Sequence, residues 1–214
     1  MSPGAVDHVA LFATPVVAAD LDGAETINRE LTELLLAEAN SSPGLRRSNV
    51  GGWHSERDLH SRPEPCYGVV LEAVVARVDE LVARLAAAAG VGPVPRYRHR
   101  LEAWAMVMRA GDYVILHDHG DAHFSAVYWV DTGDDSPEQP ESGRMVLVDP
   151  RRGVRPIPQL EVFSPHSTVK PHAGSYLVFP GWLQHYVHPY RGERPRISIS
   201  CNVVLDPPPC EEKV

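Results

Sequence analysis

The 214-residue sequence predicts an α+β fold that is mainly β, a double-stranded β-helix of the jelly-roll or cupin-like type with two N-terminal helices packed on its outer sheet. Two helical patterns precede residue 101, and about six short apolar or alternating runs follow it. Helices first and strands afterwards indicate α+β rather than alternating α/β units. Twenty prolines also suit a chain rich in strands and loops better than a helix bundle.

The first hundred residues contain an expected strand and the two expected helices. Residues 11–21 are mostly apolar and predict an opening strand. Residues 24–40 and 69–90 repeat Leu, Ile and Val at helical spacing, and Gly90 is a suitable helix stop. Between the helices, residues 41–65 hold too many Gly and Pro for a helix and predict a long loop.

The segment after residue 100 changes to short runs of the kind that form strands, each bounded by turn residues. These expected strands are 101–109, 112–117, 124–130, 144–150, 175–180 and 196–204. Two long connections, 130–143 and 151–174, separate some of them. Long loops of this kind often serve as lids or binding loops.

The length and the lack of internal repeats predict one domain over residues 1–214. Within it we expect a helical N-terminal portion (1–100), a jelly-roll core (101–205) and a frayed tail (206–214). The sequence does not indicate an oligomeric state.

The charge and cysteine content exclude several classes of function. The net charge of −8 and the lack of a basic stripe argue against a nucleic-acid partner. No apolar run long enough for a membrane span and no secretory leader are visible in the sequence. The three cysteines have no CxxC spacing, so a disulfide framework is not expected, and the setting is expected to be cytoplasmic.

Imidazole side chains crowd the end of one expected strand, in the sequence HDHGDAH at residues 117–123. Residues i and i+2 of a strand face the same side, so His117 and His119 present two ring nitrogens together. A metal site needs a further ligand, and His185 after a later apolar strand is the candidate. His119, Asp121 and His185 form the alternative set, although Asp121 also suits an ordinary turn.

The last expected strand alternates apolar and polar residues in RISIS, with Ile197 and Ile199 on one face. Arg196 and Ser198 therefore share the opposite face. A planar guanidinium bonds a carboxylate through two parallel hydrogen bonds, so this pair predicts a carboxylate clamp. Metal plus a carboxylate ligand is the chemistry that the combined pattern indicates.

The order of these motifs resembles that of the jelly-roll iron(II)/2-oxoglutarate-dependent oxygenase superfamily, and more narrowly a group of small bacterial oxygenases. The resemblance covers most of the chain. The matching stretches are Trp104, Gly111, 117–119, 125–129, 149–151, 179–185 and 196–202. Met106, Gly120 and Ala126 depart from the group's usual Asn, Pro and Gly, so substrate specificity need not carry over.

The resemblance implies iron(II) held by His117, His119 and His185, and 2-oxoglutarate held through its far carboxylate by Arg196 and Ser198. Tyr113 is expected to donate a hydrogen bond to this co-substrate. The implied reaction is the O2-dependent hydroxylation of an unactivated C–H bond. The expected substrate is an amino acid, a peptidyl residue or a related small metabolite.

Two alternatives stay open at the level of the sequence. One is a cupin-like metal-dependent enzyme that does not use 2-oxoglutarate, which a three-histidine set would suit. The other is a non-catalytic jelly-roll binding protein whose histidines are structural. His54 and His60 in the long loop could face the site, and Trp104, Tyr128, Trp129 and Trp182 could wall it off from water.

Overall fold

The computed structural model describes residues 12–208 except residues 136, 152 and 161, and it has two helices and two antiparallel sheets. Helix α1 spans Ala24–Ser41, helix α2 spans Pro65–Ala88, and a short 3-10 helix spans Leu59–Ser61. The predicted fold class, mainly β with a jelly-roll arrangement and two helices on the outer sheet, is confirmed.

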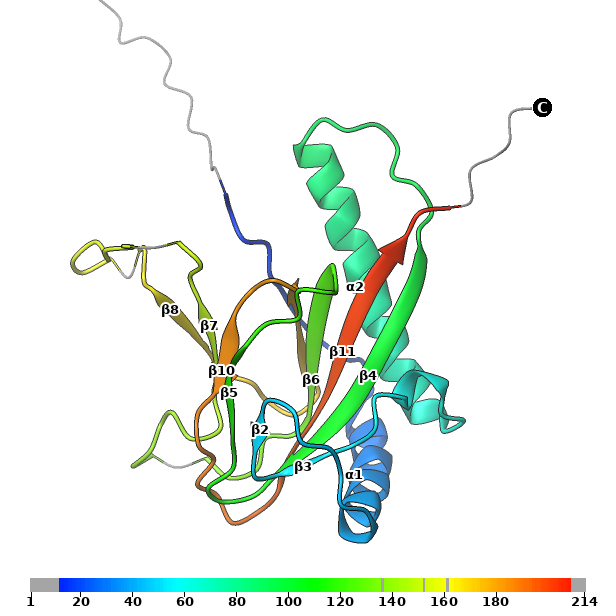
Figure 1. Ribbon diagram of the computed structural model, residues 1–214, viewed down its shortest axis with the longest axis vertical. Helices are drawn as coiled ribbons and strands as arrows, with labels where there is room; N and C mark the ends of the chain where they lie inside the picture. Colours follow the sequence, from blue (N-terminus) through cyan, green and yellow to red (C-terminus); the bar gives the residue numbers. More distant parts are fainter. Residues whose placement is uncertain (1–11, 136, 152, 161, 209–214) are drawn as a thin grey trace, which may run out of the picture.

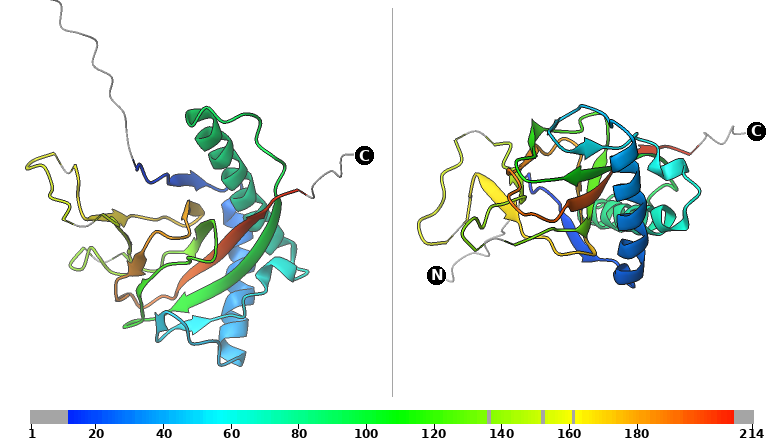
Figure 2. Two further views of the ribbon diagram at one scale, coloured as in Figure 1. Left: turned by 45° about the horizontal axis from the view of Figure 1, so that its top comes forward. Right: turned by 90° about the horizontal axis from the view of Figure 1, so that it is seen from below.

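The strands form a larger and a smaller sheet that face each other (Figures 1 and 2). In sheet order, the larger sheet contains β1 (Val17–Asp20), β9 (Ser175–Pro180), β6 (Phe124–Asp131), β11 (Arg196–Asp206), β4 (Arg98–Met108) and β3 (Trp53–His54). The smaller sheet contains β2 (Asn49–Val50), β5 (Tyr113–His117), β10 (His185–Val187), β7 (Met145–Val148) and β8 (His166–Val169).

The main core lies between the two helices and the outer face of the larger sheet (Figure 1). Alternate residues of β11, among them Ile197, Ile199 and Val203, face this core because strand side chains alternate between faces. Leu31 and Leu35 of α1 and several valines of α2 cover them. Full burial stabilises each such side chain by roughly 1.5–3 kcal/mol, so this layer holds the helices to the sheet.

The inner face of the larger sheet looks toward the smaller sheet. Two smaller apolar clusters lie between the sheets, one around Trp129 and Phe179 and the other around Met106 and Tyr190. They leave a cavity of about 320 Å³. The residues of β11 that alternate with the core positions, Arg196, Ser198 and Ser200, line this cavity.

Several predicted elements have different bounds in the structure. The opening strand is restricted to β1, and residue 11 lies outside the described residues, as do residues 209–214 of the predicted tail. Helix α2 begins at Pro65, where proline at the first helical position needs no amide hydrogen. The strands β2, β3, β8 and β10 were not predicted, because they are two to four residues long and, unlike the equally short β1 and β7, do not stand in apolar runs of the sequence.

The N-terminal portion is integrated with the rest of the fold, since β1 pairs with β9, β2 with β5 and β3 with β4. In the described part of the chain, no helix is long and apolar enough to cross a membrane.

Candidate metal and co-substrate site

Three histidine side chains converge between the sheets. His117 ends β5 and His185 begins β10, and the two strands pair so that these residues lie directly opposite each other. His119 follows β5, and its ring centroid lies 5.0 Å from that of His117 and 5.2 Å from that of His185. One nitrogen from each ring lies within 4.8 Å of the other two. This spacing lets all three rings bind a single ion.

Backbone carbonyls fix the orientation of two of the rings. Nδ1 of His117 lies 2.9 Å from the carbonyl oxygen of Ile115, and Nδ1 of His185 lies 2.9 Å from that of Leu183. A ring that donates through Nδ1–H keeps a free lone pair on Nε2. Both rings are therefore set to bind a metal through Nε2.

Burial keeps these imidazoles neutral. Burial, together with the neighbouring histidines, lowers the pKa of His119 to about 3 and that of His185 to about 4. Burial also lowers the pKa of His117. A metal needs the neutral ring, so near pH 7 no proton competes with a metal for these sites.

A glycine ties the two histidine segments together. The amide of His119 donates to the carbonyl of Gly181 (2.7 Å), and the amide of Gly181 donates to the carbonyl of His123 (3.0 Å). A Cβ atom at residue 181 would lie 2.2 Å from the carbonyl oxygen of Ala122. Only glycine allows this close approach of two backbones, which sets His119 relative to His185.

The alternative ligand Asp121 is exposed in the turn after β5 and lines a neighbouring groove rather than the cavity. Within the described ranges, His117, His119 and His185 are the only group of three or more His, Cys, Asp or Glu residues that brings its ligand atoms together. The geometry therefore brings together the all-histidine set and not the set with Asp121.

Arg196 is a buried cation in the same cavity. Its side chain is 3% exposed, and its Nη1 lies 3.5 Å from Sδ of Met108. Among the described residues, no carboxylate lies within ion-pair distance of it. Burial lowers its pKa to about 10, so the guanidinium stays charged at neutral pH. A buried unpaired charge costs several kcal/mol unless a ligand anion compensates it.

Ser198 also fits a site for a ligand anion, because it is 4% exposed and lines the cavity next to Arg196 on β11. A carboxylate placed here would accept hydrogen bonds from a guanidinium and a hydroxyl. The buried arginine and the three neutral imidazoles thus fit a metal ion and a dicarboxylic acid in one cavity. Tyr113, by contrast, is not among the residues that line the cavity, so the structure does not bring it to the site.

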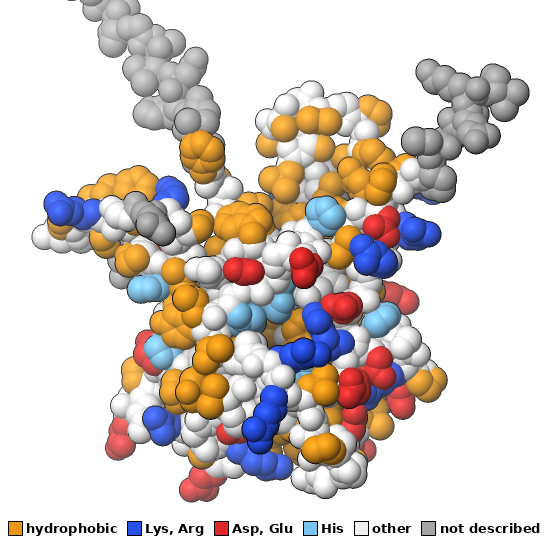
Figure 3. Space-filling model, viewed as in Figure 1, with side chains coloured by type: hydrophobic (Ala, Val, Ile, Leu, Met, Phe, Trp, Pro, Cys, Tyr) orange, Lys and Arg blue, Asp and Glu red, His pale blue; other side chains and the backbone are white. Residues whose placement is uncertain are grey.

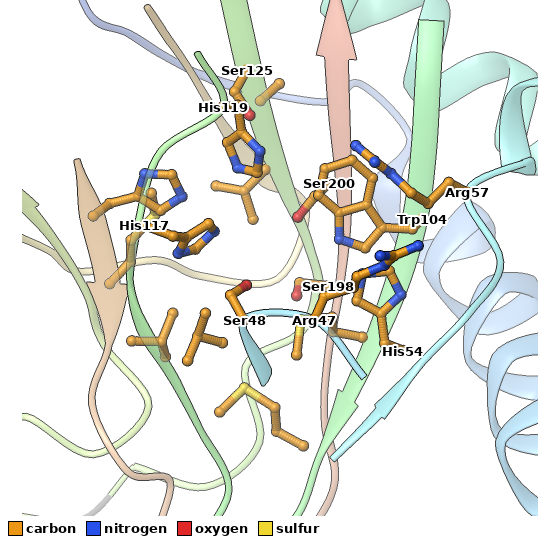
Figure 4. Close-up of a pocket in the computed structure, with 18 of the residues that line it drawn as sticks. Arg47, Ser48, His54, Arg57, Trp104, His117, His119, Ser125, Ser198 and Ser200 are labelled. Atoms are coloured by element: carbon orange, nitrogen blue, oxygen red, sulfur yellow. The ribbon is translucent and has the colours of Figure 1, made fainter. Parts of the chain in front are cut away.

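The opposite side of the cavity is built from the segment before α2 and from β4 (Figure 4). The ring of His54 stacks on Trp104 with centroids 5.6 Å apart and planes 6° from parallel. Trp104 in turn lies 5.6 Å from the ring of His119, and the guanidinium carbon of Arg57 lies 4.9 Å from the Trp104 ring centroid. Aromatic contacts, one stacked and one tilted, thus link the loop before α2 to the histidine group.

Sequence reasoning missed Arg47, Ser48 and Arg57, which line the cavity. The signal in the sequence was a long loop with two glycines flanked by arginines and histidines. His54 does face the cavity, whereas His60 lines the neighbouring groove.

Of the four aromatic residues expected to wall off the site, only Trp104 lines the cavity. Tyr128 faces the helix-covered core, Trp129 packs in a cluster between the sheets, and Trp182 is 48% exposed. Two positions that depart from the resembled pattern, Met106 and Ala126, line the cavity. The departures therefore fall where they can alter what the cavity accepts.

Comparisons with known proteins agree with this geometry. Residues 102–202 match the model of a family described as "Putative 2OG-Fe(II) oxygenase". No curated protein matches the sequence.

Three similar solved structures share the fold. A Pseudomonas putida prolyl-4-hydroxylase is 18% identical, covers 91% of this chain and 94% of its own, and has a TM-score of 0.56. The non-heme α-ketoglutarate-dependent epimerase SnoN of nogalamycin biosynthesis is 16% identical, with coverages of 92% and 82% and a TM-score of 0.60. Streptomyces hygroscopicus HygX with nickel, 2-oxoglutarate and hygromycin B bound is 15% identical, with coverages of 89% and 83% and a TM-score of 0.57.

The fold, the convergent histidines and the matched segment make this chain similar to the jelly-roll oxygenases that depend on iron(II) and 2-oxoglutarate. The match over residues 102–202 spans 101 of the 214 residues, and in this segment the chain is similar to the 2OG-Fe(II) oxygenases.

Proposed function

We propose that His117, His119 and His185 hold the iron(II), and that Arg196 and Ser198 hold the far carboxylate of 2-oxoglutarate. The enzyme then hydroxylates an unactivated C–H bond of an amino acid, a peptidyl residue or a related small metabolite. The observation that carries this proposal is the buried Arg196, which has no carboxylate partner in the described chain and shares its cavity with three neutral imidazoles.

The bound iron(II) and 2-oxoglutarate supply the oxidising power, with O2 as the oxidant and succinate and carbon dioxide as co-products. The chain's own side chains bind and orient the ion and the keto acid. The carbonyls of Ile115 and Leu183 hold two imidazoles with Nε2 toward the ion. Arg196 and Ser198 fix the direction of the keto acid by holding its far end, because a guanidinium bonds a carboxylate in a defined plane.

Apolar side chains around the site exclude water. Met106, Val114 and Phe179 line the cavity, and each is at most 7% exposed. A dry surrounding strengthens the ion pair between Arg196 and a bound carboxylate and protects a reactive centre from side reactions. These residues therefore support the reaction without taking part in proton transfer.

The size of the cavity supports a small substrate or one residue of a peptide, since about 320 Å³ is at the lower end of ligand pockets and also has to hold 2-oxoglutarate. Similar proteins span both classes: one is a prolyl-4-hydroxylase, and another has hygromycin B bound. A third similar protein is an epimerase, so the mass of the product distinguishes hydroxylation from other outcomes.

Two measurements test this function. Calorimetry on manganese-loaded protein without O2 measures 2-oxoglutarate affinity, and Arg196→Met is expected to weaken it on the order of 100-fold, because it removes a buried charge partner. Aerobic turnover with iron(II), 2-oxoglutarate and a panel of amino acids and peptides is read as succinate and as product mass. His185→Ala should abolish succinate formation.

A mass increase of one oxygen atom supports hydroxylation, whereas loss of two hydrogens indicates another oxidation and an unchanged mass indicates a redox-neutral change such as epimerisation. If Arg196→Met binds 2-oxoglutarate as tightly as the unmodified protein, the assignment of the co-substrate site is wrong. If His185→Ala keeps a stoichiometric metal, the assigned metal site is wrong.

A further inference from the structure

One segment before α2 crosses from one sheet to the other, and we name residues 45–57 the crossing segment. Its β2 part pairs with β5 in the smaller sheet, and its β3 part pairs with β4 in the larger sheet. Gly51 and Gly52 join the two parts with φ of 68° and 62°, a backbone conformation that favours glycine. The crossing segment therefore closes one side of the cavity between the sheets.

Hydrogen bonds hold the first half of the crossing segment in place. The side chain of Asn49 accepts from the amide of Arg47 (2.8 Å) and donates to the carbonyls of Leu45 (3.2 Å) and Gly51 (3.1 Å). The amide of Ile115 in β5 donates to the carbonyl of Ser48 (3.0 Å). The backbone of Arg47 and Ser48 is thus fixed beside the strand that ends at His117.

The cavity is cationic although the whole chain carries a net charge of −8. Arg47, Arg57 and Arg196 line it, and of the described lining residues none is Asp or Glu. On the face in Figure 3, basic side chains lie next to histidine side chains near the middle of the molecule. A cavity lined by one sign of charge concentrates ligands of the opposite sign.

The three arginines differ in what they can still bind. Arg57 already forms an ion pair with Glu102 (2.6 Å), and Arg196 faces the proposed carboxylate of 2-oxoglutarate. Arg47 forms no ion pair with any described residue, and no hydrogen bond of its guanidinium to a described residue is present. Figure 4 places it near His54, across the cavity from His117 and His119.

The charge balance of the loaded site also leaves Arg47 uncompensated. The two positive charges of iron(II) and the two negative charges of 2-oxoglutarate cancel, and three neutral imidazoles add no charge. A ligand set with a carboxylate would have contributed one negative charge. Arg47, which is exposed at the mouth, and the buried Arg196 therefore leave the occupied cavity positive, and a positive cavity attracts an anionic substrate.

We propose that the substrate carries a carboxylate and that Arg47 binds it at the mouth of the cavity, with the hydroxyl of Ser48 beside it. This inference rests on the proposed function and names the substrate class of the same site. A single free guanidinium matches one carboxylate through two parallel hydrogen bonds. Binding there would orient the rest of the substrate toward the histidines on the other side.

The test uses probes that differ only in this charge, namely the proteinogenic L-amino acids and their N-acetyl derivatives, each as free acid and as primary amide. Calorimetry on the manganese- and 2-oxoglutarate-loaded protein measures binding, and succinate formation with iron(II) measures turnover. We expect an acid to bind at least about tenfold more tightly than its amide, and this preference to weaken at high salt.

The neighbouring Arg46 supplies a matched control, since it is exposed and does not line the cavity. Arg47→Gln should reduce the acid-over-amide preference to less than about threefold, whereas Arg46→Gln, with the same charge change, should keep it. Arg47→Lys should restore part of the preference, because it keeps the charge but loses the planar fork.

Three results overturn the proposal: amides that bind as well as acids, equal effects of Arg46→Gln and Arg47→Gln, or a panel in which no acid binds. The 2-oxoglutarate affinity of each variant is measured first. A protein that binds 2-oxoglutarate but shows no acid preference refutes the role of Arg47 alone, whereas a protein that does not bind 2-oxoglutarate refutes the proposed function.

Discussion

On the helix-covered face of the larger sheet, β11 contributes Ile197 and Ile199, which pack against the helices. On the opposite face, the same strand contributes Arg196, Ser198 and Ser200 to the cavity. The first face is filled with apolar side chains, while the second is left hollow and carries a buried charge. The pleat thus lets neighbouring residues of one strand serve stability and ligand binding separately.

The largest expected effect compares adjacent residues of β11. Ile199→Ala removes a side chain that is 2% exposed and should lower the free energy of unfolding by about 2–5 kcal/mol. Ser200 faces the cavity, and Ser200→Ala should change the free energy of unfolding by less than about 0.5 kcal/mol. Urea unfolding measures both. Equal losses would mean that the helix-covered face of β11 contributes no more to stability than the face toward the cavity.

Metal removal tests the hollow face. Manganese at a hundred times its dissociation constant should raise the free energy of unfolding by about 2.7 kcal/mol, because it binds only the folded chain. A chelator should reverse this gain. Ile199→Ala should keep the gain and His185→Ala should lose it, as thermal unfolding with and without metal will report. A gain that survives in His185→Ala would place the ion elsewhere.

Gly181→Ala sharpens the comparison, since it perturbs the link between the histidine segments and leaves the helix-covered core untouched. A Cβ atom 2.2 Å from the Ala122 carbonyl oxygen forces the turn to move. We expect a loss of about 1–3 kcal/mol in stability together with weaker metal binding. Metal titration of the folded variant measures the second effect, and unchanged affinity would show that Gly181 does not set the spacing of the rings.

The smallest effect belongs to the helix-covered face. The hydroxyl of Tyr128 donates to the side chain of Asn28 in α1. Tyr128→Phe should therefore lower the free energy of unfolding by about 1 kcal/mol and leave 2-oxoglutarate affinity unchanged. A clear change in that affinity would reveal coupling between the two faces.

The helices and six of the strands could be predicted because their apolar residues repeat with a period or form apolar runs. The same periodicity paired Arg196 with Ser198, and the HxH spacing placed His117 beside His119. His185 could be nominated only by its position after an apolar strand, since nothing local in the sequence brings β10 next to β5.

The side of the cavity formed by Arg47, His54 and Arg57 could not be predicted. These residues reach the site because β2 and β3 join different sheets, and each of those strands has only two residues. Such pairing depends on tertiary contacts and a glycine turn rather than on any repeating pattern. Tyr113 was predicted to bind the co-substrate because it lies close to His117 in the sequence, but it does not line the cavity.

The contact between Trp104 and His119 gives the protein a built-in optical reporter. The indole ring lies 5.6 Å from the imidazole ring, so a paramagnetic ion on that imidazole would quench the emission of this tryptophan. Occupancy of the centre can then be followed by fluorescence in real time, with no added label and before any substrate is known.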